Sequence, residues 1–451
     1  MLPKKTSLAI ITFGFMILLL EATRVARPFT PSAVLDFKPR QATTVAIEPP
    51  RQRPTARTPK IQISGPNLID DHGALKSFYQ ALWRTEAGQA GAVTRILHYG
   101  DSPTTADSIT ADVRSLFQQH YGDAGHGFVL VAKPWAWYGH RGVDLRGKGW
   151  HIEAASQSHA RDGYHGLGGV SFEGDEGAVS DIALAEDHGR IEIEYLQQSG
   201  GGSFSVSAEG QLLADTKTEG SDKQPGFAMF PLPAGARHVQ IRVEHGHVRL
   251  FGVSFERETP GVIYNSLGLN GGQVQAVVRY FEKTQWTEQL RHQRPDLVVV
   301  NYGTNESLFA DYIERYYAGE LREVIRRIQN AVPNASVLIM SPMDRGQRDS
   351  TGQIVTPPTL PRLVEIQRQT AAEMHCAFFN TFQAMGGEGT MARWYDAQPR
   401  LVTADFMHPF PAGARKVGVL FYQALDTGFR QFKAHQQQTL ARRTPIEETE
   451  P

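Results

Sequence analysis

The chain has 451 residues, of which 41% are hydrophobic and 21% charged, and its 46 basic and 47 acidic residues give a formal net charge of −1. This length allows two or three domains, and the composition excludes global disorder. The near-neutral charge excludes a large basic surface, so no nucleic-acid partner is expected. The single cysteine, Cys376, excludes an intrachain disulfide framework and a cysteine-rich metal site.

Residues 1–27 are typical of an export signal. Lys4 and Lys5 precede an apolar run over residues 8–20, whose 13 residues suit a signal peptide and fall short of the roughly 17–25 of a spanning helix. Two alternatives stay open: a cleaved signal peptide, or an uncleaved anchor in the inner membrane. Residues 28–66 hold eight of the 26 prolines and predict an extended linker. We therefore expect an exported protein of the periplasm or cell envelope.

The elements after residue 66 begin with a helix predicted over 71–89, a buried strand over 93–99 and a helix over 105–121. Between about 135 and 257, short alternating runs predict an all-β segment of sandwich or jelly-roll type, with strands at 191–195, 203–207 and 239–243. Strands at 262–265, 296–301, 336–340 and 377–380 then alternate with helices at 274–292, 312–331, 361–375 and 412–434. This alternation predicts a parallel sheet covered on both faces.

The simplest architecture is one α/β domain with a β domain inserted near its start. The predicted bounds are 67–135 for the first α/β part, 136–257 for the inserted domain, 258–435 for the second α/β part and 436–451 for a polar tail. In open α/β sheets, ligands bind beyond the carboxyl ends of the strands. Polar residues that follow these strands are therefore the candidate site.

Three such places carry polar residues that packing does not require. Ser102 follows the strand 93–99 on a tight turn before a helix. It is either an exposed nucleophile or an ordinary N-cap of that helix. Asn301 ends the strand 296–301, as either an oxyanion donor or a turn residue. Asp405 and His408 are either a surface pair or a unit in which the carboxylate holds Nδ1–H and leaves Nε2 free to accept a proton from serine. Their joint occurrence favours the catalytic alternatives.

The order of these residues resembles the SGNH, or GDSL-like, hydrolase family. Its first block matches Gly100-Asp101-Ser102, and its second matches Gly268-Leu269-Asn270-Gly271. The third block, Gly-x-Asn-Asp, matches Gly303-Thr304-Asn305-Glu306 except at the last position, and the fifth, Asp-x-x-His, matches Asp405 and His408.

The resemblance implies an α/β fold with a flavodoxin-like parallel sheet and a catalytic triad of Ser102, His408 and Asp405. It also implies an oxyanion hole made by the backbone N–H groups of Ser102 and Gly271 and the side chain of Asn305. Neither a metal nor an organic cofactor is expected.

Residues 95–107, the β segment and residues 265–271 together resemble bacterial peptidoglycan O-acetylesterases, although Pro103 stands where many of these have His. In that family a β-sandwich similar to a carbohydrate-binding module interrupts the SGNH domain. The resemblance implies a serine esterase that removes O-acetyl or similar acyl groups from a cell-envelope glycan, with peptidoglycan as the candidate. Aromatic residues of the β segment either stack on sugars or fill its core: Trp135, Trp137, Tyr138, Trp150, Tyr164 and Phe172.

Three other functions stay open. The same triad serves a carbohydrate O-acetyltransferase, in which a sugar hydroxyl replaces water. A non-catalytic envelope binding protein would use the scaffold alone, and a lipase or thioesterase would add an acyl groove.

Overall fold

The computed structural model describes residues 67–156 and 162–443. The predicted signal or anchor and the whole of the predicted linker lie outside the described residues, and so does the end of the polar tail. Within the described part, no helix combines the length and the apolar character that crossing a membrane requires.

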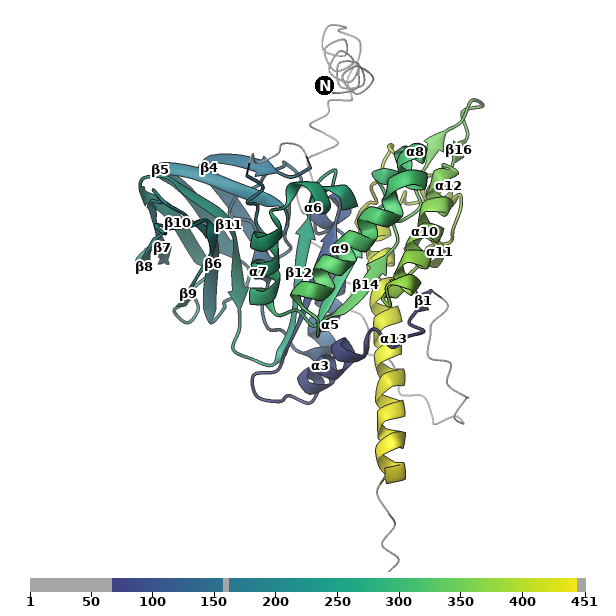
Figure 1. Ribbon diagram of the computed structural model, residues 1–451, viewed down its shortest axis with the longest axis horizontal. Coiled ribbons are helices and arrows are strands. Elements are labelled where there is room, and N and C mark those ends of the chain that lie inside the picture. The colour runs from purple at the N-terminus through teal and green to yellow at the C-terminus, as the bar shows by residue number, and fades with distance from the viewer. Residues whose placement is uncertain (1–66, 157–161, 444–451) are drawn as a thin grey trace, which may run out of the picture. The chain divides into compact units, whose positions relative to one another are not determined.

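A six-stranded sheet organises the α/β part of the described chain, in the order β1-β17-β14-β13-β2-β12 (Figure 1). Its strands are β1 (Leu68–Ile69), β2 (Val93–Gly100), β12 (Gly261–Gly268), β13 (Leu297–Asn301), β14 (Ser336–Met340) and β17 (Ala377–Phe379). All neighbours pair in parallel except β1, which is antiparallel to β17. Counted along the chain, the five parallel strands have the order 2-1-3-4-5, which is the flavodoxin-like order. The predicted parallel sheet is confirmed.

Helices cover both faces of this sheet. Along β13, Leu297 and Val299 join one hydrophobic cluster and Val298 and Val300 the other, so every side chain of the strand interior is apolar. The first cluster includes residues of α3 (Lys76–Glu86), α5 (Thr110–Tyr121), α12 (Thr390–Asp396) and α13 (Pro411–Arg443). The second includes residues of α6 (Val274–Tyr280), α7 (Lys283–Gln293), α9 (Ala318–Ala331) and α10 (Thr359–Glu373). Short elements complete this part: α4 (Ser102–Thr105), a 3₁₀ turn (Glu306–Leu308), α8 (Ala310–Tyr312), a π-helix (Ile313–Tyr317), β15 (Gln347–Arg348), β16 (Ile354–Val355) and α11 (Thr381–Ala384).

Two helices predicted as continuous are interrupted, and the prediction is wrong there. The helix 105–121 is split by a turn in which Asp107 has φ 52°. The helix 274–292 breaks at Phe281 and Glu282, where the Glu282 side chain accepts the Gln285 N–H and caps α7. The helix predicted over 312–331 is continuous, with a π-helical turn at Ile313–Tyr317 between α8 and α9. Apolar periodicity misses these breaks because both flanking pieces keep the same face against the sheet.

A second sheet of nine antiparallel strands lies between β2 and β12 in the described sequence, in the order β8-β7-β10-β5-β11-β6-β9, with β3 beside β11 and β4 beside β5. Its strands are β3 (Gly127–Val129), β4 (Val143–Ala154), β5 (Val170–Leu184), β6 (Arg190–Gln197), β7 (Ser203–Ala208), β8 (Gln211–Lys217), β9 (Gln224–Pro231), β10 (His238–His245) and β11 (Val248–Glu256). The three predicted strands correspond to β6, β7 and β10. Strand β3 precedes the predicted boundary at residue 136. The sandwich or jelly-roll form of an inserted domain stays a prediction.

A buried ion pair holds the turn between α4 and α5. The Arg114 Nη2 lies 2.5 Å from the Asp107 Oδ2, and these side chains are 4% and 2% exposed. Asp107 also accepts hydrogen bonds from the Thr110 hydroxyl at 2.6 Å and the Arg141 N–H at 2.8 Å. Burial alone would raise the pKa of Asp107, but the Arg114 charge outweighs it and keeps this pKa well below its usual range.

Replacing Arg114 by Met is expected to lower the free energy of unfolding by about 3–5 kcal/mol, because the Asp107 carboxylate is left buried and unpaired. Urea unfolding measures the change. The control is Arg326→Met, which removes a surface partner of Glu323 and is expected to cost less than about 1 kcal/mol. Equal losses in the two variants would contradict the assigned role of the Asp107–Arg114 pair.

Candidate active site

The ends of three neighbouring strands lie in one row of the parallel sheet. Gly100 of β2 pairs with Gly268 of β12 on one side and with Asn301 of β13 on the other. The Leu269 N–H donates to the Gly100 carbonyl at 2.9 Å and continues this alignment past the strands. A Cβ at Gly268 would lie 2.1 Å from the Thr105 nitrogen, so glycine is required there. The segments that follow the three strands therefore start side by side.

Ser102 begins α4 directly after β2. Its Oγ lies 2.8 Å from the His408 Nε2. The N-cap residue of α4 is Asp101, whose side chain makes no capping hydrogen bond. The alternative of an ordinary capping serine is therefore wrong. Pro103 fits the first turn, where a helix needs no backbone N–H.

The loop before α13 orients His408. The His408 Nδ1 lies 2.6 Å from the Asp405 Oδ2. The other oxygen, Oδ1, accepts the Thr403 hydroxyl at 2.5 Å and the N–H groups of Met407 and His408 at 2.9 and 3.0 Å. Phe406 has φ 58°, a conformation that costs energy in a residue with a side chain and concentrates at functional sites. The carboxylate is thus fixed in the direction that faces the imidazole.

Electrostatics favour a charged His408–Asp405 pair. Burial lowers the pKa of His408, but the hydrogen bond and the negative charge of Asp405 outweigh it, so this pKa is raised above its ordinary value. Burial would raise the pKa of Asp405, but the hydrogen bonds that it accepts keep this pKa well below its usual range. The two side chains are still 37% and 46% exposed, so solvent and ligands reach them.

A second carboxylate also acts on His408. Asp101 is 3% exposed, and burial raises its pKa to about 6 against the opposing effects of the Thr304 side chain, which bonds to it, and of the His408 charge. In turn, the Asp101 charge contributes to the raised pKa of His408. In the sequence, Asp101 is only the middle residue of Gly-Asp-Ser, because nothing local indicates that its side chain reaches Thr304.

Gly271 and Asn305 lie on adjoining turns. The Gly272 N–H donates to the Leu269 carbonyl at 2.7 Å in a turn where Gly271 has φ 67°. The Asn305 Nδ2 donates to the Gly272 carbonyl at 2.9 Å, which joins the two turns. Asn301 instead donates to the carbonyls of Met340 and Ser341 at 3.0 and 3.1 Å. Of the two alternatives for Asn301, the structural one holds.

Glu306, the departure from Gly-x-Asn-Asp, has a clear structural role. It is fully buried, and its Oε1 accepts the Val274 N–H at 2.7 Å at the start of α6. This contact ties the Asn305 turn to the helix that follows Gly271. Burial raises the pKa of Glu306 from 4.5 to about 8. The buried carboxyl group is therefore largely protonated at neutral pH.

Trp137 and Ser156, which precede β12 in the chain, also hold the turn that contains Gly271, through contacts with Asn270. The Trp137 Nε1 donates to the Asn270 Oδ1 at 3.1 Å, and the Ser156 hydroxyl donates to the Asn270 carbonyl at 2.5 Å. Trp135, Tyr138 and Phe172 are buried in the core, whereas Trp137, Trp150 and Tyr164 are half-buried. Three of the six aromatic candidates for sugar stacking therefore have a packing role.

Arg345 lies between two loops of the site. It is 8% exposed, its Nη1 lies 3.4 Å from the Ser307 Oγ, and the Asp405 charge acts on it. Burial lowers its pKa. Arginine in a loop after an apolar strand has no sequence pattern that would have marked it.

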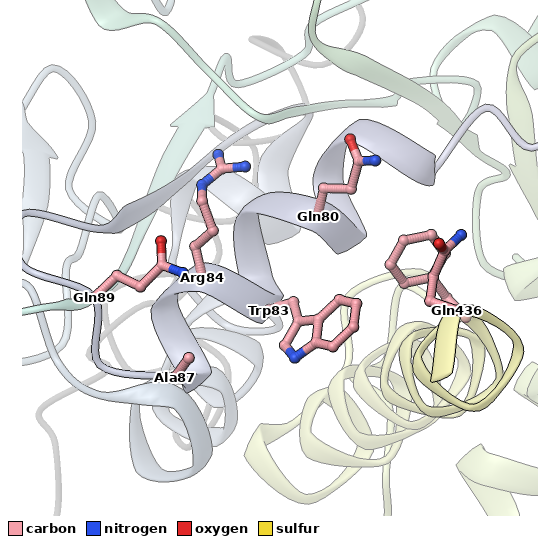
Figure 2. A pocket seen from close by; sticks show the side chains of 7 residues that line it. Gln80, Trp83, Arg84, Ala87, Gln89 and Gln436 are labelled. Atoms are coloured by element: carbon pink, nitrogen blue, oxygen red, sulfur yellow. The ribbon is translucent and has the colours of Figure 1, made fainter. Parts of the chain in front are cut away.

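No group of His, Cys, Asp and Glu within residues 67–156 and 162–443 is arranged to hold a metal ion. A hollow of about 540 Å³ between α3 and α13 is lined by residues that include Trp83, Arg84 and Gln436 (Figure 2). It lies near the amino end of β2, whereas Ser102 follows the carboxyl end. The eight residues of β2 separate the two by about 25 Å, so this hollow is not part of the site.

Residues 234–416 match the sequence model of the GDSL-like lipase/acylhydrolase family. This range includes Gly271, Asn305, Asp405 and His408, whereas Ser102 lies before it. No curated protein matches the chain. Among solved structures, a peptidoglycan O-acetylesterase matches with a TM-score of 0.69 and 21% identity over 80% of this chain and 99% of that one, which shows a shared fold.

Two other solved structures are more distant. A Bacillus subtilis protein matches with a TM-score of 0.32 and 14% identity over 62% of this chain and 90% of its own. A salicylyl-acyltransferase from a tetracycline biosynthetic pathway matches with a TM-score of 0.30 and 11% identity over 64% of this chain and 95% of its own. Neither likeness is strong enough to support a conclusion about this chain.

The His408 imidazole is expected to titrate above pH 6.5, its ordinary value, because the neighbouring carboxylates stabilise the charged form. Asp405→Asn removes the main source of this effect and should move the titration to lower pH. Histidine NMR titration measures both, with the exposed His435 as the internal reference. A midpoint that does not change in the variant would contradict the assigned pairing.

Glu306→Gln is expected to change the pH dependence of stability. A carboxyl pKa raised to about 8 stabilises the fold fully below pH 4.5, and this contribution is lost as pH rises through 8. Relative to the Gln variant, the wild type should lose up to about 1.4 kcal/mol per pH unit over that range. Urea unfolding at several pH values measures the difference, and a difference that is flat with pH would contradict a buried neutral Glu306.

Proposed function

We propose that this chain, which carries a domain of the GDSL-like lipase/acylhydrolase family over residues 234–416, is an SGNH-type ester hydrolase that removes O-acetyl groups from a cell-envelope glycan through Ser102, His408 and Asp405. The observation that carries the proposal is the continuous path of hydrogen bonds from the Ser102 Oγ to the His408 Nε2, at 2.8 Å, and from the His408 Nδ1 to Asp405, at 2.6 Å. A serine, an imidazole and a carboxylate connected in this way are the parts of a nucleophilic acyl-transfer site.

In the proposed reaction, the Ser102 Oγ attacks the ester carbonyl while His408 takes its proton. Asp405 holds the imidazole in the tautomer that leaves Nε2 free to accept, and its charge stabilises the imidazolium that forms. His408 then returns the proton to the leaving sugar hydroxyl, which leaves an acetyl group on Ser102. A water molecule, deprotonated by His408, attacks this acyl-enzyme and releases acetate and free serine.

Three groups are proposed to bind the oxyanion: the N–H groups of Ser102 and Gly271 and the amide of Asn305. Support comes from the contact of the Asn305 amide with the Gly272 carbonyl, which brings the second and third groups onto adjoining turns. Each such donor is typically worth about 10²–10³ in rate. Glu306, Trp137 and Ser156 hold these turns through the contacts described above.

An acetylated glycan is proposed because the fold likeness to a peptidoglycan O-acetylesterase extends over 99% of that protein. Peptidoglycan is accordingly the first substrate to test. In the same proposal, residues 136–257 form an inserted β domain, joined by β3, between α/β parts at 67–135 and 258–435. The N-terminal features support export to the periplasm or cell envelope, with residues 1–27 as signal or anchor and 28–66 as a spacer.

The wild-type chain is expected to release acetate from an aryl acetate and from O-acetylated peptidoglycan. Ser102→Ala and His408→Ala should each lower kcat by about a thousandfold or more, because the triad acts as a unit. The controls are Ser221→Ala and His435→Ala, which change an exposed serine and an exposed histidine elsewhere. Colorimetric and chromatographic assays of acetate measure both substrates.

Activity on the aryl ester alone would support the catalytic triad and contradict the proposal that the substrate is an acetylated glycan. Acetate release that persists in Ser102→Ala would contradict the assignment of Ser102 as the nucleophile. If acetyl groups passed to added sugar acceptors faster than to water, the enzyme would be a transferase that uses the same triad.

A further inference from the structure

A second hollow, of about 470 Å³, opens beside the proposed oxyanion turns. Gln273, Gln275 and Arg279 line one side, and Phe309, Arg315 and Tyr316 line the other; we call it the Phe309–Tyr316 groove. Phe309 is 52% exposed and Tyr316 is 56% exposed. Two large aromatic side chains that remain this exposed in one hollow are typical of a binding surface.

The groove adjoins the proposed site directly. Gln273 follows Gly271 and Gly272 in the chain, and the Gly272 carbonyl accepts the Asn305 amide. Phe309 lies just beyond the Glu306–Leu308 turn, and Glu306 binds the N–H of Val274, the residue next to Gln273. The two sides of the groove are therefore extensions of the two turns proposed to bind the oxyanion.

The walls of the groove are held in place before any ligand binds. Glu320 accepts hydrogen bonds from both the Arg279 guanidinium and the Tyr312 hydroxyl. The π-helix packs Ile313 and Tyr317 into the core, with 2% and 0% exposed, and leaves Arg315 and Tyr316 outside. π-helical turns occur frequently at functional sites. A preformed surface loses little conformational entropy on binding.

The charges of the groove balance. Arg279 is paired with Glu320, and Asp311, which also lines the hollow, offsets Arg315. The Gln275 side-chain amide donates to the Gln273 side chain, which fixes both polar groups at the surface. The exposed lining of the groove is more apolar than polar, amides and charges surround it, and the balance of these charges does not favour an anion. This combination suits a pyranose, which has apolar C–H faces and a rim of hydroxyl groups.

We propose that the Phe309–Tyr316 groove binds a neutral pyranose of the acylated glycan, next to the sugar that carries the ester. This inference rests on the proposed function and names a subsite of it. The ring of Phe309 or Tyr316 would pack on the sugar, while Gln273 and Arg315 would bind its hydroxyl groups. A glycan that enters this way would present the acetyl group of the neighbouring sugar to Ser102.

The test compares two substrates in Phe309→Ala, Tyr316→Ala and the double variant. The ratio of kcat/KM for O-acetylated peptidoglycan to that for an aryl acetate should fall by about tenfold in the double variant, mainly through KM, which corresponds to the loss of aromatic contacts. Tyr316→Phe keeps the aromatic ring, so its ratio should stay close to that of the wild type and above that of Tyr316→Ala. The controls are Leu212→Ala and Met229→Ala, which remove exposed apolar side chains of β8 and β9.

A ratio that stays constant in the double variant would overturn the groove proposal, as would a selective loss on long-chain aryl esters. Direct binding separates this failure from a failure of the proposed function. Soluble peptidoglycan disaccharide fragments without peptide stems or acetyl esters are titrated into the full-length Ser102→Ala protein by calorimetry. Binding that the Phe309→Ala/Tyr316→Ala changes abolish supports the groove whatever the esterase assay shows, and an absence of binding contradicts it.

Discussion

The alignment of three parallel strand ends is the constraint on which the site depends. Gly100 pairs with Gly268 and Asn301, so the segments that follow β2, β12 and β13 leave the sheet next to one another. A slip of one residue would send every side chain of a strand to the opposite face; because both faces are apolar, it is the close packing of particular side chains in the two hydrophobic clusters that holds this register. Ser102 and the turns of Gly271 and Asn305 therefore take their positions from a register that the core determines.

Polar contacts between these segments then convert a row of strand ends into a defined site. Asn305 bonds to Gly272, Glu306 to Val274 and Thr304 to Asp101, so each of the three segments is tied to another. The antiparallel sheet is connected between β2 and β12, which are neighbours in the parallel sheet. The intervening chain re-enters the sheet at the amino end of β12, away from the site, but residues within it reach the site through the Trp137 and Ser156 contacts to Asn270.

Burial divides the carboxyl groups of the site into two kinds. Asp405 receives four hydrogen bonds, so its charge is stabilised and raises the pKa of His408. Glu306 receives fewer bonds in a fully buried position, and its pKa is raised to about 8. Hydrogen bonding to the charged form lowers the pKa of Asp405, whereas desolvation raises the pKa of Glu306. Asp405 thereby stabilises the charged form of the His408 imidazole, whereas Glu306 is a neutral structural tie.

The sequence by itself determined the elements, the parallel sheet and the order of the motifs, because apolar alternation and short motifs such as Asp-x-x-His are local properties. The Ser102, Asp405 and His408 contacts agree with that order. Only the tertiary structure decided that Asn301 supports β14 and that Glu306 reaches Val274. It also placed Asp101 and Arg345 near His408 and Asp405. Two segments about 35 residues apart in the chain form the Phe309–Tyr316 groove in the same way. The physical reason is that these contacts join side chains that are distant in the chain, and neither periodicity nor a motif encodes which distant groups meet.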